Sequence, residues 1–189
     1  EAEGGITKMH LMMESIKNLI KADILKEADQ VAIIQFDDRA EVLLPFTPAN
    51  QKSRVLSAVD RLTEFSGGTN MGAGMKLALG LLEKASGSRR MLLFTDGMTI
   101  SEDFVREIAK KFAEIGVPVT AVGLGEEWND DLLSYITDIT QGKPFHVLPD
   151  SANPIPPSVR ATDLPSLIFD EIQHAALEVV TNVELNVST

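Results

Sequence analysis

The chain has 189 residues, of which 44% are apolar, and its formal net charge at pH 7 is −11. This length and apolar fraction suit one globular domain and argue against disorder throughout. No apolar run reaches the roughly 18 to 20 residues that a membrane-spanning helix needs. The excess of 28 acidic over 17 basic side chains makes nucleic acid a poor partner. The absence of cysteine excludes a disulfide scaffold, a cysteine-ligated zinc site and a thiol nucleophile, and it fits a reducing compartment.

Residues 6–27 are the first predicted helix, because apolar side chains recur there at spacings of one, three and four. Two runs rich in β-branched residues follow at 30–36 and 40–46, and the turn between them predicts a hairpin. Pro45 and Pro48 favour the edge of the sheet for the second of these strands, because proline cannot donate a ladder hydrogen bond.

Helices and strands alternate through the next hundred residues. Predicted helices lie at 51–63, 71–85, 102–115 and 130–140, and predicted strands at 90–95, 117–124 and 144–148. This alternation predicts an α/β fold, a three-layer α/β/α sandwich around a mostly parallel, Rossmann-like sheet with one antiparallel edge strand.

The composition changes after Pro149. Residues 150–162 contain three prolines and little that could pack, so we interpret them as a linker. It would join a domain at residues 1–149 to a C-terminal helix and strand at residues 163–189. That last segment either packs on the domain or leads to a further module.

Two loops carry the candidate site. Residues 66–70, Ser-Gly-Gly-Thr-Asn, enter a helix and present the Thr69 hydroxyl near its N-terminus, while Asp96 directly follows the strand at 90–95. Ligands bind parallel sheets beyond the carboxyl ends of their strands. If both loops lie at that edge, they offer a hydroxyl and a carboxylate to one hard cation such as Mg²⁺. The simpler alternative is that Thr69 caps a helix and Asp96 caps a turn.

With these loops in this order, the chain resembles a von Willebrand factor type A domain over about residues 4–148. Residues 66–70 look like the threonine loop of that family, and residues 93–97 look like its aspartate loop. The resemblance implies a metal-ion-dependent adhesion site with Thr69 and Asp96 as ligands of Mg²⁺ or Mn²⁺. It also implies a non-catalytic module in which the cation binds an acidic side chain of a partner protein. Thr69 would be a direct ligand, and Asp96 would bind directly or through water.

One part of the family pattern is absent, because the 189 residues contain no DxSxS motif. In the family this motif ends the central strand, just before a segment like residues 4–9. We therefore expect a missing strand and a weak or empty cation site, since water would fill most coordination positions. We also expect the gap in the sheet to be closed by a longer natural chain, by residues 181–187, by strand exchange in a homodimer or by an altered strand order.

The competing class is an enzyme, a Mg²⁺-dependent α/β phosphotransfer or hydrolase domain with Asp96 as its acid. Met98 argues against it, because phosphatases of the haloacid dehalogenase type require a second acid at that position. Residues 123–128 lack the third glycine of a dinucleotide fingerprint, and the three histidines share no metal-ligand spacing. Trp128 either covers the start of a helix or faces a partner, and we favour the covering role.

Overall fold

The computed structural model describes residues 7–62, 69–95, 97–125, 128–148 and 158–171. The helices are α1 (Lys8–Lys21), α2 (Lys52–Val59), α3 (Met71–Leu82), α4 (Glu102–Glu114) and α5 (Asp130–Thr140). The strands are β1 (Gln30–Phe36), β2 (Ala40–Pro48), β3 (Met91–Thr95), β4 (Val119–Leu124), β5 (Pro144–Leu148) and β6 (Ser158–Arg160).

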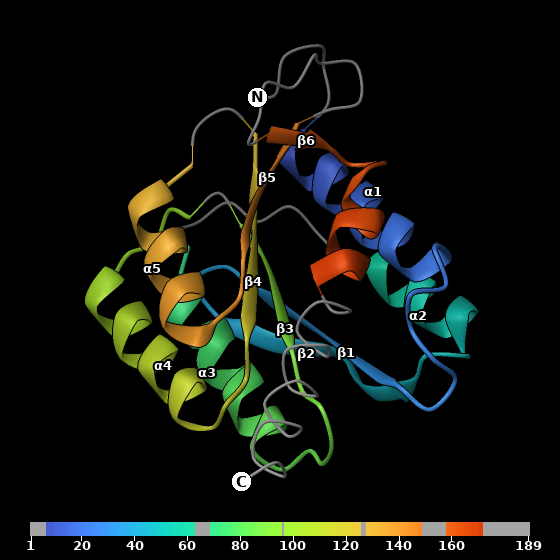
Figure 1. Ribbon diagram of the computed structural model, residues 1–189, viewed down its shortest axis with the longest axis horizontal. Coiled ribbons are helices and arrows are strands. Elements are labelled where there is room, and N and C mark those ends of the chain that lie inside the picture. Colours follow the sequence, from blue (N-terminus) through green and yellow to red (C-terminus); the bar gives the residue numbers. More distant parts are fainter. Residues whose placement is uncertain (1–6, 63–68, 96, 126–127, 149–157, 172–189) are drawn as a thin grey trace, which may run out of the picture.

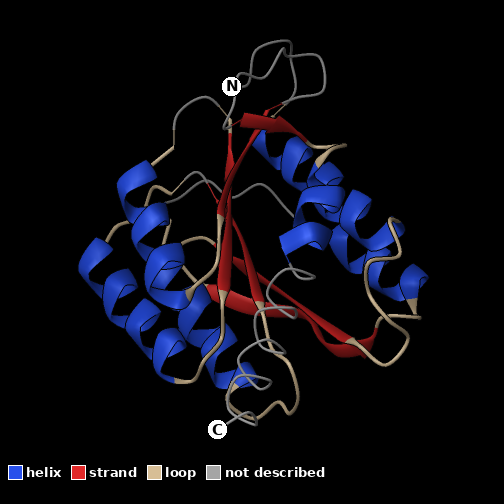
Figure 2. Cartoon of the chain, viewed as in Figure 1, coloured by secondary structure: helices blue, strands red, loops and turns tan. Residues whose placement is uncertain are grey.

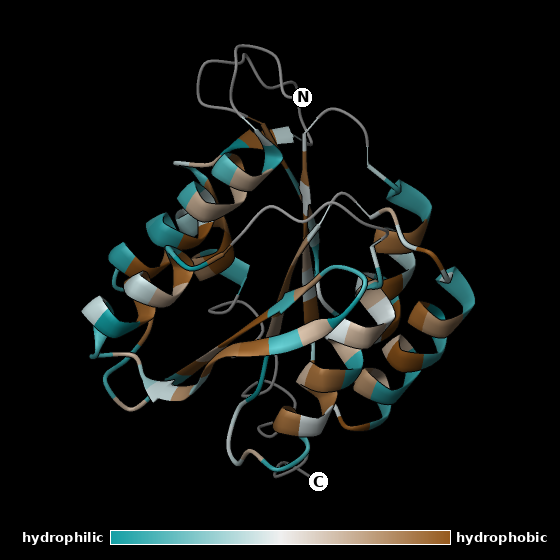
Figure 3. Cartoon of the chain, turned by 180° about the vertical axis from the view of Figure 1, so that it is seen from behind, coloured by the Kyte–Doolittle hydropathy of each residue, from teal (hydrophilic) through white to brown (hydrophobic). Residues whose placement is uncertain are grey.

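The strands lie between two layers of helices (Figures 1 and 2). Helices α3, α4 and α5 cover one side, and α1, α2 and the helical residues 164–171 cover the other. The apolar sides of the helices face the strands (Figure 3), as in α4, where Val105, Ile108 and Phe112 are buried. The predicted three-layer α/β fold is confirmed. Within the described ranges, no helix is long and apolar enough to cross a membrane.

Strands β1 and β2 form the predicted antiparallel hairpin, with Phe36 paired to Ala40. The turn is held by the carboxylate of Asp37, which accepts a hydrogen bond from the N–H of Arg39 at 2.7 Å. This hydrogen bond holds the pKa of the Asp37 carboxyl below its usual value, because it stabilises the charged form. Pro45 lies on β2 with its side chain exposed, which agrees with the predicted edge position.

Strands β3, β4, β5 and β6 form a parallel sheet in that order. Strand β6 was not predicted, because its three residues lie within the range 150–162 that the sequence assigns to a linker. It continues the sheet beside β5, with Ser158 in register with His146. The described end of the predicted linker is therefore part of the domain.

The two sheets are separate in the described residues, because β1 pairs with β2, β3 pairs with β4, and no pairing joins β1 to β3. The break lies where the sequence analysis expects the missing central strand. Packing of helices on both sides bridges it. On one side, Phe36 of β1 packs against Gly74 of α3, and α3 shares a buried cluster with Leu93 of β3. On the other side, α1 contacts both α2 and β4.

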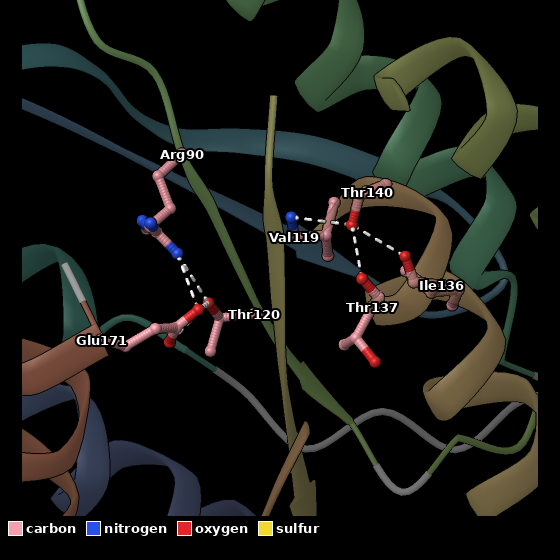
Figure 4. Close-up of polar contacts among 7 residues, drawn as sticks. All are labelled: Arg90, Val119, Thr120, Ile136, Thr137, Thr140 and Glu171. Carbon is pink, nitrogen blue, oxygen red and sulfur yellow. Dashed lines mark hydrogen bonds and ion pairs between the residues drawn. The ribbon is translucent and has the colours of Figure 1, made fainter. Parts of the chain in front are cut away.

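Residues 164–171 are anchored on the parallel sheet. Leu164 and Ile168 are buried in one cluster with Val122 of β4. Glu171 is 6% exposed, and its carboxylate binds the guanidinium of Arg90 at 2.9 Å and the hydroxyl of Thr120 at 3.2 Å (Figure 4). This segment therefore belongs to the packed core, and the assignment of residues beyond 171 stays a prediction.

We expect Arg90→Ala to lower the free energy of unfolding by about 2 kcal/mol, because it leaves the Glu171 carboxylate buried without its cation. Urea unfolding measures this cost. A matched control is Lys111→Ala, which breaks an exposed pair with Glu107 and should cost about 0.3 kcal/mol. Equal costs for the two variants would contradict a special role for the buried pair.

Candidate functional site

Thr69 lies at the entrance to α3, and its backbone joins two loops. The carbonyl of Thr69 accepts a hydrogen bond from the N–H of Ile100 at 2.9 Å and another from the hydroxyl of Thr99 at 3.2 Å. Both donors follow β3. The chain entering α3 and the loop after β3 therefore lie together.

Asn70 connects the same place to the hairpin. Its N–H donates to the carbonyl of Asp37, which directly follows β1. Its side-chain oxygen accepts from the N–H of Ala73 at 3.1 Å and so caps α3. The N-cap of α3 is therefore Asn70 and not Thr69, which removes the capping alternative considered for Thr69. The ends of β1 and β3 meet at the start of α3.

Asp96 lies outside the described residues, so its pairing with Thr69 stays a prediction. The residues on either side of it are joined by a hydrogen bond, because the N–H of Gly97 donates to the hydroxyl of Thr95 at 3.0 Å. Gly97 has a φ of +77°, and a Cβ at this position would lie 2.9 Å from the backbone nitrogen of Asn129. Only glycine meets both conditions without strain.

Asn129 adds a third segment to the edge. Its side chain caps α5 by accepting from the N–H of Leu132 at 3.1 Å, and it donates to the carboxylate of Glu102 at 2.8 Å. Beside these polar contacts, Met98 is 61% exposed and Ile100 is 66% exposed. No sequence motif marks Ile100 or Asn129, and Met98 is notable in the sequence only as the residue in place of an acid.

The described residues provide only part of a cation site. The Thr69 hydroxyl is a hard oxygen donor of the kind that Mg²⁺ and Mn²⁺ accept. However, no three His, Asp or Glu side chains converge to hold a metal ion within the described residues. The donor chemistry fits a hard cation, but the donor set of these residues alone does not complete its coordination.

Comparison with known proteins shows the family of the chain. Residues 4–156 match the family model of the von Willebrand factor type A domain. The chain belongs to this family. It is 31% identical over 143 residues to the uncharacterized protein YfbK of Escherichia coli, covering 71% of this chain and 24% of that protein. It is 29% identical over 147 residues to mouse vitrin, covering 76% of this chain and 22% of vitrin. The chain thus spans about a quarter of the length of these relatives.

Solved structures show the same type A fold at low sequence identity. BatB from Bacteroides thetaiotaomicron superposes with a TM-score of 0.70 at 19% identity, covering 89% of this chain and 88% of that chain. Manganese-loaded TRAP from Plasmodium vivax gives 0.68 at 18%, covering 90% and 70%. Mussel byssus proximal thread matrix protein 1, with a zinc-occupied MIDAS motif, gives 0.65 at 20%, covering 87% and 40%. The family resemblance drawn from the two loops is confirmed.

Proposed function

We propose that this chain is a non-catalytic protein-interaction module. Its binding site is the edge formed by the loop after β1, the entrance to α3 and the loop after β3. The observation that supports this proposal is the pair of hydrogen bonds from Ile100 and Thr99 to the Thr69 carbonyl. They tie the threonine loop to the loop that contains Asp96, the two segments that the family uses for its adhesion site.

At this edge, Mg²⁺ or Mn²⁺ bridges the domain to an acidic side chain of a partner protein. Thr69 is a direct ligand through its hydroxyl, and Asp96 binds directly or through water. The net charge of −11 supports a bridging cation, because without one the domain would repel an acidic partner. Manganese in TRAP and zinc in the mussel protein support divalent cations in this family. The full affinity requires oxygen donors beyond the described residues.

Mn²⁺ is the probe that tests this assignment, because a paramagnetic ion broadens the NMR signals of nearby amides even when it binds weakly. We expect Mn²⁺ to broaden the amide signals of Thr69, Gly97 and Ile100 first. The broadening should weaken in Thr69→Val, which removes the hydroxyl ligand, and in Asp96→Asn, which replaces the charged carboxylate with a neutral amide. Asp60→Asn is the control, because Asp60, at the C-terminus of α2, pairs with Lys17 of α1 and not with the loops of the candidate site.

Two results would contradict the proposal. Broadening centred elsewhere, or unchanged in both ligand variants, would show that the cation does not bind at this edge. If the chain hydrolyses a generic phosphate ester and Asp96→Asn abolishes this activity, the function is that of an enzyme and not of a non-catalytic interaction module.

A further inference from the structure

Trp128 lies against β4 and β5 of the parallel sheet, close to the candidate site. Its indole ring stacks on the imidazole of His146, with ring centroids 4.7 Å apart and planes 8° from parallel. Gly123 of β4 is in register with His146 of β5, and a Cβ at Gly123 would overlap the indole. Trp128 also packs against the buried cluster of α3, α4 and α5, which is the covering role that the sequence analysis favoured. The absence of a side chain at Gly123 thus makes room for this ring.

The imidazole beneath Trp128 is held at both nitrogens. Nδ1 of His146 lies 2.7 Å from the hydroxyl of Ser158, and Nε2 binds the carbonyl of Gly125. Because a carbonyl can only accept, Nε2 carries a proton, and in the neutral ring Nδ1 accepts from Ser158. His146 is 9% exposed, so water competes little for these bonds. One ring therefore connects β5, β6 and the segment that leaves β4.

That segment continues directly to the candidate site. Asn129 follows Trp128, and its backbone and Cβ lie against Gly97 in the loop after β3. The same loop reaches Thr69 through the N–H of Ile100. Contacts therefore connect Ser158, through the stacked rings and Asn129, to the loop after β3. That loop in turn binds the carbonyl of Thr69 through the N–H of Ile100.

We propose that Trp128 and His146 are positioning residues for the loop after β3. The stack holds Asn129 against Gly97, and so it fixes the place of the loop relative to α3. This proposal rests on the proposed function only in assigning a binding role to the loop after β3. The positioning of the loop by Trp128 and His146 requires no cation and no partner.

Hydrogen exchange at two amides tests this proposal. The N–H of Gly97 donates to the hydroxyl of Thr95, and the N–H of Ile100 donates to the carbonyl of Thr69. We expect His146→Ala and Gly123→Ala each to accelerate exchange at both amides by about tenfold. Since both variants act through Trp128, combining them should add no more than about twofold further. Ser158→Ala is the mild variant, for which we expect about a threefold acceleration without loss of folding.

Two controls separate positioning from general stability. His10→Ala changes an exposed residue of α1 and should leave exchange at Gly97 and Ile100 unchanged. Val55→Ala, in the buried cluster of α2, destabilises the fold far from the loop. Equal acceleration at both amides in Val55→Ala and His146→Ala, at matched global stability, would overturn the proposal.

Fluorescence supplies a second readout, because Trp128 is the only tryptophan of the chain. We expect its emission to shift to longer wavelength in His146→Ala as the indole loses its stacked position. A shifted emission with unchanged exchange at Gly97 and Ile100 would also overturn the proposal, since the stack would then exist without holding the loop. Neither measurement uses Mn²⁺, so this failure is distinct from a failure of the cation assignment.

Discussion

Joining a continuous apolar strand ahead of residue 4 is expected to raise the free energy of unfolding by about 5 kcal/mol. The described residues leave one edge of β1 and one edge of β3 without a neighbouring strand. Each backbone group that gains a partner in a buried setting contributes on the order of 1 kcal/mol, and a strand between two sheets satisfies several. The added strand also buries its side chains under α1 and α3.

The connection favours this position for the strand. The side chain of Lys8, at the start of α1, lies against Gly125, which follows β4. A parallel strand that ends at this edge would enter α1 directly, and α1 would then lead to β1 in a right-handed crossover. Because helices cover both faces, the strand should be Val and Ile throughout. Residues 181–187 alternate apolar with polar side chains, so they would bury Glu184 and Asn186.

Urea unfolding of the extended protein measures the gain. The matched control has the same length and composition but carries proline at the centre of the strand, which removes a ladder hydrogen bond and should lose most of the stabilisation. Equal stabilisation by both versions would contradict strand insertion. If the chain without the extension forms a strand-exchanged homodimer, size-exclusion chromatography should show the extended protein as a monomer.

Phe112→Ala is expected to lower the free energy of unfolding by about 4 kcal/mol. Phe112 of α4 is fully buried, in a cluster that also contains Met71 and Met75 of α3 and Val119 of β4. Removing the ring leaves a cavity that these neighbours fill only in part. The same cluster holds α3 and α4 against the sheet, and the N-termini of these helices border the candidate site.

Urea unfolding also measures this cost, with Phe169→Ala as the matched control. Phe169 is 41% exposed, and its replacement should change stability by no more than about 0.5 kcal/mol. A cost below about 1 kcal/mol for Phe112→Ala would show that the cluster collapses around the missing ring and is not tightly packed there.

Strong local signals made several elements predictable from the sequence. Helix α5 begins and ends at the predicted residues, because Asn129 caps it and acidic residues occupy its first turn. Strand β5 also has the predicted bounds. By contrast, α1 ends at Lys21, although the predicted helix extends to residue 27 and its apolar stripe to Ile24. Asp23 adopts a positive φ of 55° there, and no glycine marks the turn.

Tertiary contacts explain what the sequence could not show. Strand β6 has only three residues, and its ladder depends on β5 rather than on its own pattern. In the candidate site, Thr69 was predicted because its hydroxyl lies in a glycine-containing loop that enters a helix, and the family resemblance pointed to the same loop. Its partner Ile100 contributes only a backbone N–H, which any residue except proline could supply, so no side-chain pattern identifies it.

The break between the two sheets, as the described residues show it, also bears on which part of the fold opens first. Within the described residues, side-chain packing through α1 and α3 holds the β1–β2 hairpin to the four-stranded sheet, without a ladder of backbone bonds. Regions of a fold open as contiguous units that often coincide with supersecondary motifs, and a hairpin held by packing can separate without breaking its own ladder. Under tension, the hairpin should detach as one piece while both ladders stay intact.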